Sequence, residues 1–136
     1  DGEAVAVLRE GLVRNPRAAT LHHALGLALV RRQQKTDSLA ELRAAAELAP
    51  ESGRFAYVYA MGLDDAGRTA DALKVLDAAR LRNPYDRDVL SALAFLLVKA
   101  GKREVALRHA QELRELDPEN AEYARMAQQI EGGLPR

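Results

Sequence analysis

The sequence predicts an all-α fold, an α-solenoid of antiparallel helical hairpins with about eight helices. Four prolines, Pro16, Pro50, Pro84 and Pro118, stand 34 residues apart, and each follows a segment that reads as the last turn of a helix. Since proline cannot continue a helix, this spacing indicates a helical repeat. Apolar residues make up 48% of the chain and aromatic residues only 4%. The core must therefore be built mainly from Ala, Leu and Val, of which Ala and Leu favour helices most.

The charge balance and the absence of cysteine exclude several classes of function. Twenty basic side chains balance twenty acidic ones, which gives no electrostatic reason to expect a nucleic acid or a membrane surface as partner. No apolar run is long enough for a membrane span. Without cysteine, disulfides, Cys-ligated metals, covalent haem and a cysteine nucleophile are excluded within this segment. We therefore expect no cofactor, no nucleic acid partner and no membrane span in this segment.

Helix breakers and caps divide the chain into helices. Each proline marks the end of a helix, because it biases the residue before it away from the helical conformation. Ser52, Asp86 and Asn120 follow prolines at the position where a side chain caps the first turn of the next helix. The expected helices, in order, cover residues 2–14, 18–33, 37–49, 53–66, 69–82, 86–100, 102–116 and 119–131.

Within each hairpin a tight turn must join the two helices. Gly67 and Gly101 stand between the helices of the second and third hairpins and suit such turns. The first hairpin has Gln33 at the same position, at a cost of about 1 kcal/mol if the turn needs the left-handed conformation that favours glycine. After the last helix, the tail at 132–136 contains two glycines and a proline, so it should end the helix and fray.

These features resemble the tetratricopeptide-repeat (TPR) family, whose 34-residue pattern is W-x2-L-G-x2-Y, then A-x3-F, then P. The residues that carry the resemblance are Leu25, Gly26, Leu29, Leu42 and Ala45 in the first repeat, Tyr59, Ala60, Leu63, Gly67, Ala72, Leu76 and Ala79 in the second, and Leu90, Leu93, Ala94, Leu97, Gly101 and Ala106 in the third. The Trp position departs from the pattern, because it holds His22, Ala56 and Leu90. The resemblance implies a TPR superhelix with the second helix of a truncated repeat at 1–16, repeats at 17–50, 51–84 and 85–118, a C-terminal capping helix at 119–131 and a frayed tail at 132–136.

The two ends of this array differ in character. The last expected helix is polar along its length, as a capping helix is. On the first helix, Ala4, Leu8, Gly11 and Leu12 form the face that a preceding partner helix would cover. We expect Leu8 and Leu12 to be uncovered there, and this open N-terminal face to promote self-association.

Candidate catalytic and metal-binding side chains do not converge. His22 and His23 are neighbours on one helix and point about 100° apart, while His109 lies on another helix, so no metal site is expected. Asp64 and Asp65 also point apart, which argues against an acid–base pair. No Gly-rich phosphate loop, Ser nucleophile motif or HExxH occurs. We therefore expect no enzyme activity in this segment.

The charged positions repeat with the 34-residue period. Asp64 and Asp65 oppose the helix dipole at the end of a helix, so a nearby cation should compensate them. Ion-pair ladders between adjacent repeats are one interpretation, with Arg54 and Asp88 as a pair, and a solvated charged rim is the alternative. The two candidate ladders are Arg31, Asp65 and Lys99, and Thr20, Arg54, Asp88 and Glu122.

In TPR folds the first helix of each hairpin lines a concave groove, so the resemblance implies where a peptide would bind. Family members that hold chaperone C-termini place Lys, Asn and Arg at the groove positions, whereas this chain has Leu27, Tyr57, Met61 and Phe95. This apolar stripe favours a protein or peptide ligand of another class. The alternative is that Met61 and Phe95 pack between helices. The implied groove residues are Thr20, His23, Leu27, Arg31, Arg54, Tyr57, Met61, Asp65, Asp88, Ser91, Phe95 and Lys99.

Two functional classes remain open. The first is a protein–protein interaction scaffold that presents this groove to a polypeptide. The second is a C-terminal TPR appendage of a larger periplasmic redox protein, because residues 55–68 resemble TPR tails found behind bacterial multihaem cytochrome domains. The chain has no Cys-x-x-Cys-His motif, so any haem of such a protein would lie upstream.

Overall fold

The computed structural model describes residues 2–134 and is all-α, as predicted. The bounds of the helices agree with the predicted bounds to within two residues. In chain order the helices are α1 (Gly2–Arg14), α2 (Ala19–Arg31), α3 (Lys35–Leu48), α4 (Gly53–Asp65), α5 (Thr69–Arg82), α6 (Arg87–Lys99), α7 (Arg103–Leu116) and α8 (Ala121–Gly132).

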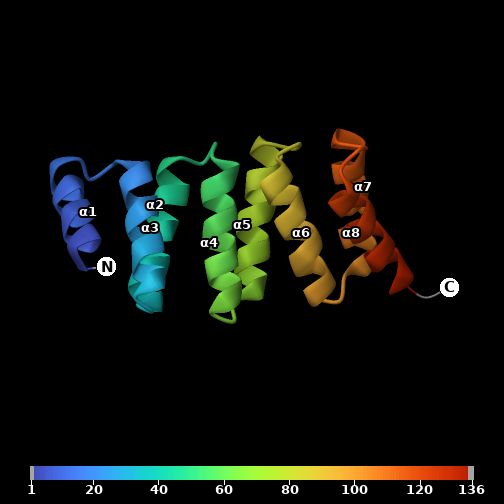
Figure 1. The fold of residues 1–136 in the computed structure, drawn as a ribbon, viewed down its shortest axis with the longest axis horizontal. Helices are drawn as coiled ribbons and strands as arrows, with labels where there is room; N and C mark the ends of the chain where they lie inside the picture. Colours follow the sequence, from blue (N-terminus) through green and yellow to red (C-terminus); the bar gives the residue numbers. More distant parts are fainter. Residues whose placement is uncertain (1, 135–136) are drawn as a thin grey trace.

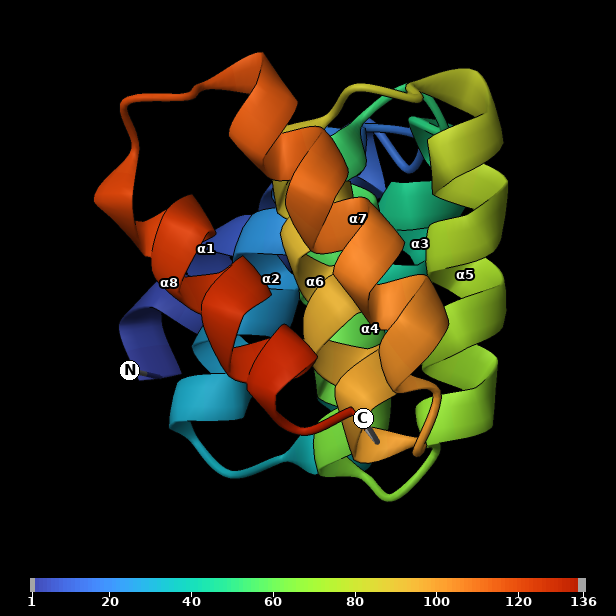
Figure 2. The same ribbon diagram turned by 90° about the vertical axis from the view of Figure 1, so that its right-hand side faces the viewer.

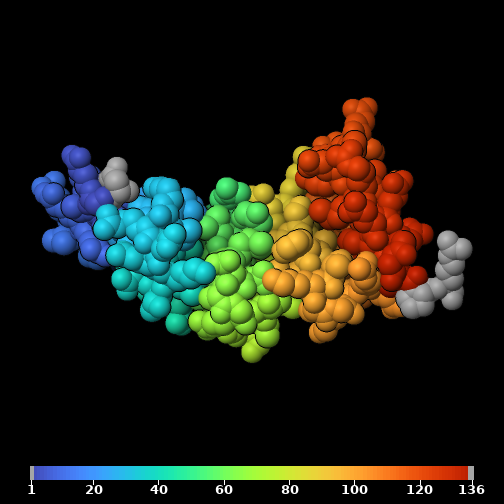
Figure 3. Space-filling view, turned by 60° about the horizontal axis from the view of Figure 1, so that its bottom comes forward, coloured from blue at the N-terminus to red at the C-terminus, as the bar shows by residue number. Residues whose placement is uncertain are grey.

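The helices stand side by side in a row that follows the order of the chain (Figure 1). Successive hairpins pair α2 with α3, α4 with α5 and α6 with α7, while α8 packs on α7. Figure 2, which looks along the row, shows α2 and α8 on one side and α3 and α5 on the other. The first helices of the three hairpins are α2, α4 and α6. Because α4 also packs directly against α6, these first helices draw together. The row therefore curves, and the side of the first helices is its inner, concave side. The space-filling view shows this hollow between the blue N-terminal and red C-terminal ends (Figure 3).

Caps and turns begin and end the helices where the sequence predicts. The side chains of Ser52 and Asp86 accept the backbone N–H groups three residues ahead, at 3.1 and 3.0 Å. Gly67 and Gly101 adopt φ values of 80° and 78°, the left-handed conformation that glycine tolerates best. Gln33 adopts the same conformation with φ 60°, so the left-handed turn expected at this position is confirmed.

Leucine and alanine side chains fill the interfaces between helices. The predicted core residues Leu25, Leu29, Leu63 and Leu93 are at most 1% exposed. Gly26 allows α2 to approach α3, because a Cβ atom at this position would lie only 2.6 Å from Cδ2 of Leu42. The larger apolar cluster extends from α4 to α8, and a smaller one joins α1 to α2.

The prediction that Leu8 and Leu12 are uncovered is wrong. Both side chains are half-buried and pack against the cluster of α1 and α2, which contains Val5 and Leu25. The reason is that α1 contacts the following hairpin as the second helix of a repeat does, and these leucines point forward onto α2. The large apolar side chains that α1 exposes are instead Val7 and Val13, at 62% and 82%.

The length and hydropathy of the helices also bear on membrane topology. Among the helices of residues 2–134, none combines the length and the apolar character that a membrane span requires.

Candidate peptide-binding groove

The implied groove residues lie on α2, α4 and α6, and all of them retain solvent-exposed surface. Contacts between neighbouring first helices bring several of them together. The ring of His23 on α2 stacks on Phe55 of α4, with centroids 4.4 Å apart. The exposed members are Thr20, Arg31, Arg54, Asp65, Phe95 and Lys99, and the half-buried members are His23, Leu27, Tyr57, Met61, Asp88 and Ser91.

The apolar groove residues divide into two kinds. Phe95 is 55% exposed, although most of the apolar side chains of α6 are buried. Tyr57 and Met61 are half-buried and pack against the larger core cluster, so they contribute to the fold as well as to the surface. Phe95 is therefore the groove residue whose apolar surface is most available to a ligand.

Arg54 links α4 to α6 on this surface, as the sequence predicted. Its guanidinium Nη1 lies 3.8 Å from Oδ2 of Asp88, with both side chains substantially exposed, at 62% and 48%. The guanidinium carbon also lies 5.3 Å from the centre of the Tyr57 ring, within range of a cation–π interaction. Because exposed ion pairs contribute little stability, a ligand could displace this pair at low cost.

Of the two interpretations of Arg31, Asp65 and Lys99, the structure does not support the ion-pair ladder. Lys99 instead binds the adjacent Asp64, with Nζ 3.0 Å from both carboxylate oxygens. Asp65 pairs with Lys35 at the start of α3, at 3.3 Å. Equal spacing along the repeat predicts the position of a residue on its helix. It does not predict which of two neighbouring carboxylates the ammonium group of a flexible lysine side chain reaches.

Asp64 is a buried carboxylate at the end of α4, only 8% exposed. The Thr69 hydroxyl donates to its Oδ1 at 2.6 Å, and Lys99 supplies the compensating cation. The hydrogen bond from Thr69, together with Lys99, holds the pKa of Asp64 below its ordinary value, although burial acts in the opposite direction. The carboxylate thus remains charged and ties the ends of α4, α5 and α6 together.

His22 and His23 make packing and hydrogen-bond contacts between segments of the chain. His23 stacks on Phe55, and burial with the nearby charge of Arg54 lowers its pKa. His22 lies between Glu41 and the carbonyl of Pro16, at 2.6 and 2.7 Å. Within residues 2–134, no group of three or more histidine or acidic side chains is arranged to hold a metal ion.

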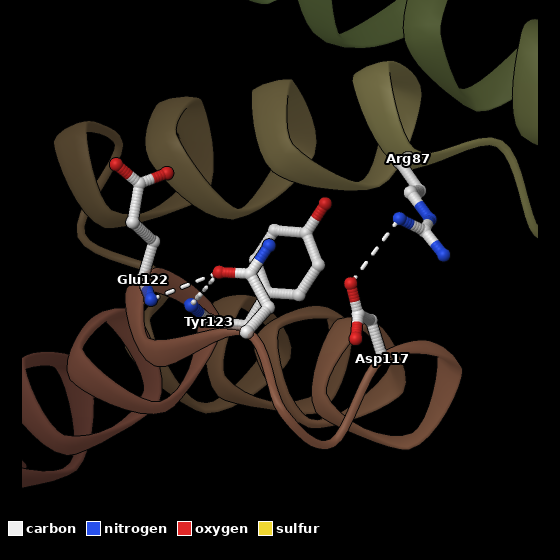
Figure 4. Close-up of polar contacts among 5 residues, drawn as sticks. Arg87, Asp117, Glu122 and Tyr123 are labelled. Carbon is white, nitrogen blue, oxygen red and sulfur yellow. Dashed lines mark hydrogen bonds and ion pairs between the residues drawn. The ribbon is translucent and has the colours of Figure 1, made fainter.

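A cleft of about 610 Å³ opens between α6 and α8. The start of α8 is fixed by its cap, since Oδ1 of Asn120 accepts the backbone N–H groups of Glu122 and Tyr123 (Figure 4). Figure 4 also shows Arg87 of α6 reaching Asp117 at the end of α7, at 3.4 Å. The lining residues are Ala94, Phe95, Val98, Lys99, Arg103, Glu122, Arg125, Met126, Gln129 and Ile130.

Sequence reasoning missed the contribution of α8 to this surface. Arg125 and Gln129 stand 34 residues after Ser91 and Phe95, so the repeat period could have placed them among the groove positions. The polar composition of α8 instead predicts a capping helix.

Comparison with known proteins identifies the repeat. A family model described as tetratricopeptide repeat matches residues 65–130. Among solved structures, MamA gives a TM-score of 0.81 at 15% identity, over 95% of this chain and 75% of its own. YrrB, described as a TPR protein with an unusual peptide-binding site, gives 0.76 at 21% identity, over 96% of this chain and 68% of its own. PilF of Pseudomonas aeruginosa gives 0.78 at 20% identity, over 90% of this chain and 56% of its own.

At these identities the solved structures establish the fold alone. No curated protein sequence matches the chain, and the comparisons give no support to the resemblance to multihaem cytochrome tails. The 34-residue period, the succession of hairpins and the family model agree with one another. The family model identifies tetratricopeptide repeats over residues 65–130, and the hairpins before them have the same fold.

Proposed function

We propose that the protein is an interaction scaffold that binds a polypeptide segment along the surface of α2, α4 and α6. The observation that carries the proposal is the exposure of Phe95, a large aromatic side chain that is 55% exposed on a first helix. Exposed aromatic side chains are typical anchors of protein interfaces. TPR folds commonly serve as scaffolds for protein partners, and YrrB is described as having a peptide-binding site, which supports the same use of this fold.

The charged residues of the groove would orient the bound segment. Arg54 and Asp88 form an exposed pair across two first helices, and Asp65 pairs with Lys35 in an exposed position. Each pair is weak because both partners remain hydrated. Ligand groups of either charge can therefore replace one partner, and the order of charges along the groove would set the direction of the peptide.

Selection from a random peptide library, followed by fluorescence anisotropy on the enriched peptides, tests this proposal. Phe95→Ala should weaken binding by about tenfold or more, as loss of a central anchor does. It should leave the melting temperature nearly unchanged, because the Phe95 side chain is largely in solvent. Tyr57 and Met61 are unsuitable for this purpose, since their truncation would also disturb the core.

Leu81→Ala is the matched control, because Leu81 is an exposed apolar residue, at 77%, on the second helix α5. It should alter neither binding nor stability. Failure of the library to yield any binding peptide, or equal binding by wild type and Phe95→Ala, would contradict the proposed function.

A further inference from the structure

The cleft between α6 and α8 has an apolar wall and a charged rim. Phe95 and Val98 of α6 face Met126 of α8 across it. Val98 and Met126 are half-buried against the core cluster, whereas Phe95 remains more than half exposed. Met side chains adapt to the shape of an apolar ligand. The cleft therefore offers a deformable apolar surface at one end of the groove.

The cleft is open because α8 is attached mainly through α7. Most contacts of α8 are with α7. The Arg87–Asp117 pair and the Asn120 cap fix the connection between these two helices. Arg103, at the start of α7, extends its guanidinium across the end of α8, into the space that a side chain at Gly133 would occupy. Its charge is thereby held at the rim of the cleft.

The acidic side chains of α4 and α6 have cationic partners within the chain, whereas two of the three cations that line the cleft have none among residues 2–134. The carboxylates Asp64, Asp65 and Asp88 each pair with a cation of the chain. At the cleft, by contrast, neither Arg103 nor Arg125 forms an ion pair with any of residues 2–134, and the one carboxylate in the lining is Glu122. With Lys99 paired to Asp64, two guanidinium groups and one carboxylate remain in the lining, so the net charge at the α6–α8 end is positive.

We propose that this cleft anchors an apolar side chain of the ligand and selects a segment whose neighbouring residues are acidic, with Arg103 and Arg125 contacting the carboxylates. The inference rests on the proposed peptide-binding function and specifies the chemistry of its ligand. An acidic segment is favoured over a neutral one because guanidinium groups bind carboxylates in a bidentate geometry. It is favoured over a basic one because the free charge at the cleft is cationic.

The composition of the selected peptides provides the first test. Peptides enriched by the wild-type protein should contain a large apolar residue with Asp or Glu within a few positions. Enrichment of apolar peptides without acidic residues, or of peptides rich in Lys and Arg, would overturn this inference while the proposed function survives. If no peptide is enriched, both fail.

Charge reversal provides the second test, with the best enriched acidic peptide as a fluorescein-labelled probe. Arg125→Glu should raise Kd about tenfold, Arg125→Lys should retain most of the affinity, and added salt should weaken wild-type binding more than that of Arg125→Glu. Arg108→Glu on α7 is the control, because it changes the net charge by the same amount at an exposed residue that does not line the cleft. This variant should bind as the wild type does. Equal affinities of Arg125→Glu and wild type would refute the assignment of this cleft, and circular dichroism of each variant establishes that it is folded.

Discussion

Gln33 occupies a backbone conformation that few side chains adopt. It has φ 60° in the turn between α2 and α3, where the equivalent turns use Gly67 and Gly101. The Cβ atom of an L-residue is crowded in this left-handed conformation, which is why glycine is favoured there. The alignment of Gln33 with two turn glycines was enough to predict this strain from the sequence.

Gln33→Gly is expected to stabilise the protein by about 1 kcal/mol, since it removes the steric cost of the left-handed conformation. Glycine also adds entropy to the unfolded chain, which keeps the gain small. Urea denaturation at neutral pH measures the difference in the free energy of unfolding. Gly67→Ala, the reverse change at the equivalent turn, should destabilise by a similar amount. A Gln33→Gly variant no more stable than the wild type would show that the turn is not strained.

At the scale of helices, His22 joins α2 to α3 and to the turn that precedes α2. Its Nδ1 lies 2.6 Å from Oε2 of Glu41 on α3, and its Nε2 lies 2.7 Å from the carbonyl oxygen of Pro16 before α2. A carboxylate and a carbonyl only accept hydrogen bonds, so this geometry favours the protonated ring, in which both nitrogens donate. Burial lowers the pKa of His22, but the hydrogen bonds to Glu41 and Pro16 and the charge of Glu41 together raise it above its ordinary value.

The sign of this shift predicts how stability depends on pH. Because the folded-state pKa lies above the unfolded value of 6.5, the stabilisation is fully present below pH 6.5 and is lost as the pH rises through the folded-state pKa. Urea denaturation from about pH 6 to 9 should show this loss in the wild type. Glu41→Gln, which removes the charge facing the ring, should flatten the dependence. Identical pH profiles for the two proteins would contradict the charged state of His22.

The sequence predicted the helices better than it predicted contacts between side chains. Prolines and turn glycines determine where helices end through backbone geometry alone, so their spacing placed every helix bound within two residues. The partner of Lys99 depends on side-chain reach, and the repeat spacing indicated Asp65 where the structure has Asp64. The cleft at α8 depends on how that helix leans on α7. Such a tilt arises from many packing contacts at once and leaves no local signal in the sequence.

Over the whole molecule, the apolar core is continuous at one end and thin at the other. The larger cluster includes buried residues from α4 to α8, whereas the smaller one consists of Val5, Leu25, Ala28 and Leu29 on α1 and α2. In a solenoid each helix is stabilised mainly by its neighbours in the row. Since the cluster of α1 and α2 contains only four buried residues, the N-terminal end should open at a lower free energy than the middle.

Native-state hydrogen exchange can test this difference along the row. Amides of α1 and α2 should exchange faster than amides of α6 and α7, because local opening starts where fewest contacts must break. Leu29→Ala and Leu93→Ala remove equal side chains that are 1% and 0% exposed, and each truncation should cost about 2–5 kcal/mol locally. Leu29→Ala should accelerate exchange in α1 and α2 and leave α6 and α7 nearly protected, whereas Leu93→Ala should accelerate exchange across α4 to α8. Uniform acceleration by Leu29→Ala would show instead that the molecule opens as one cooperative unit.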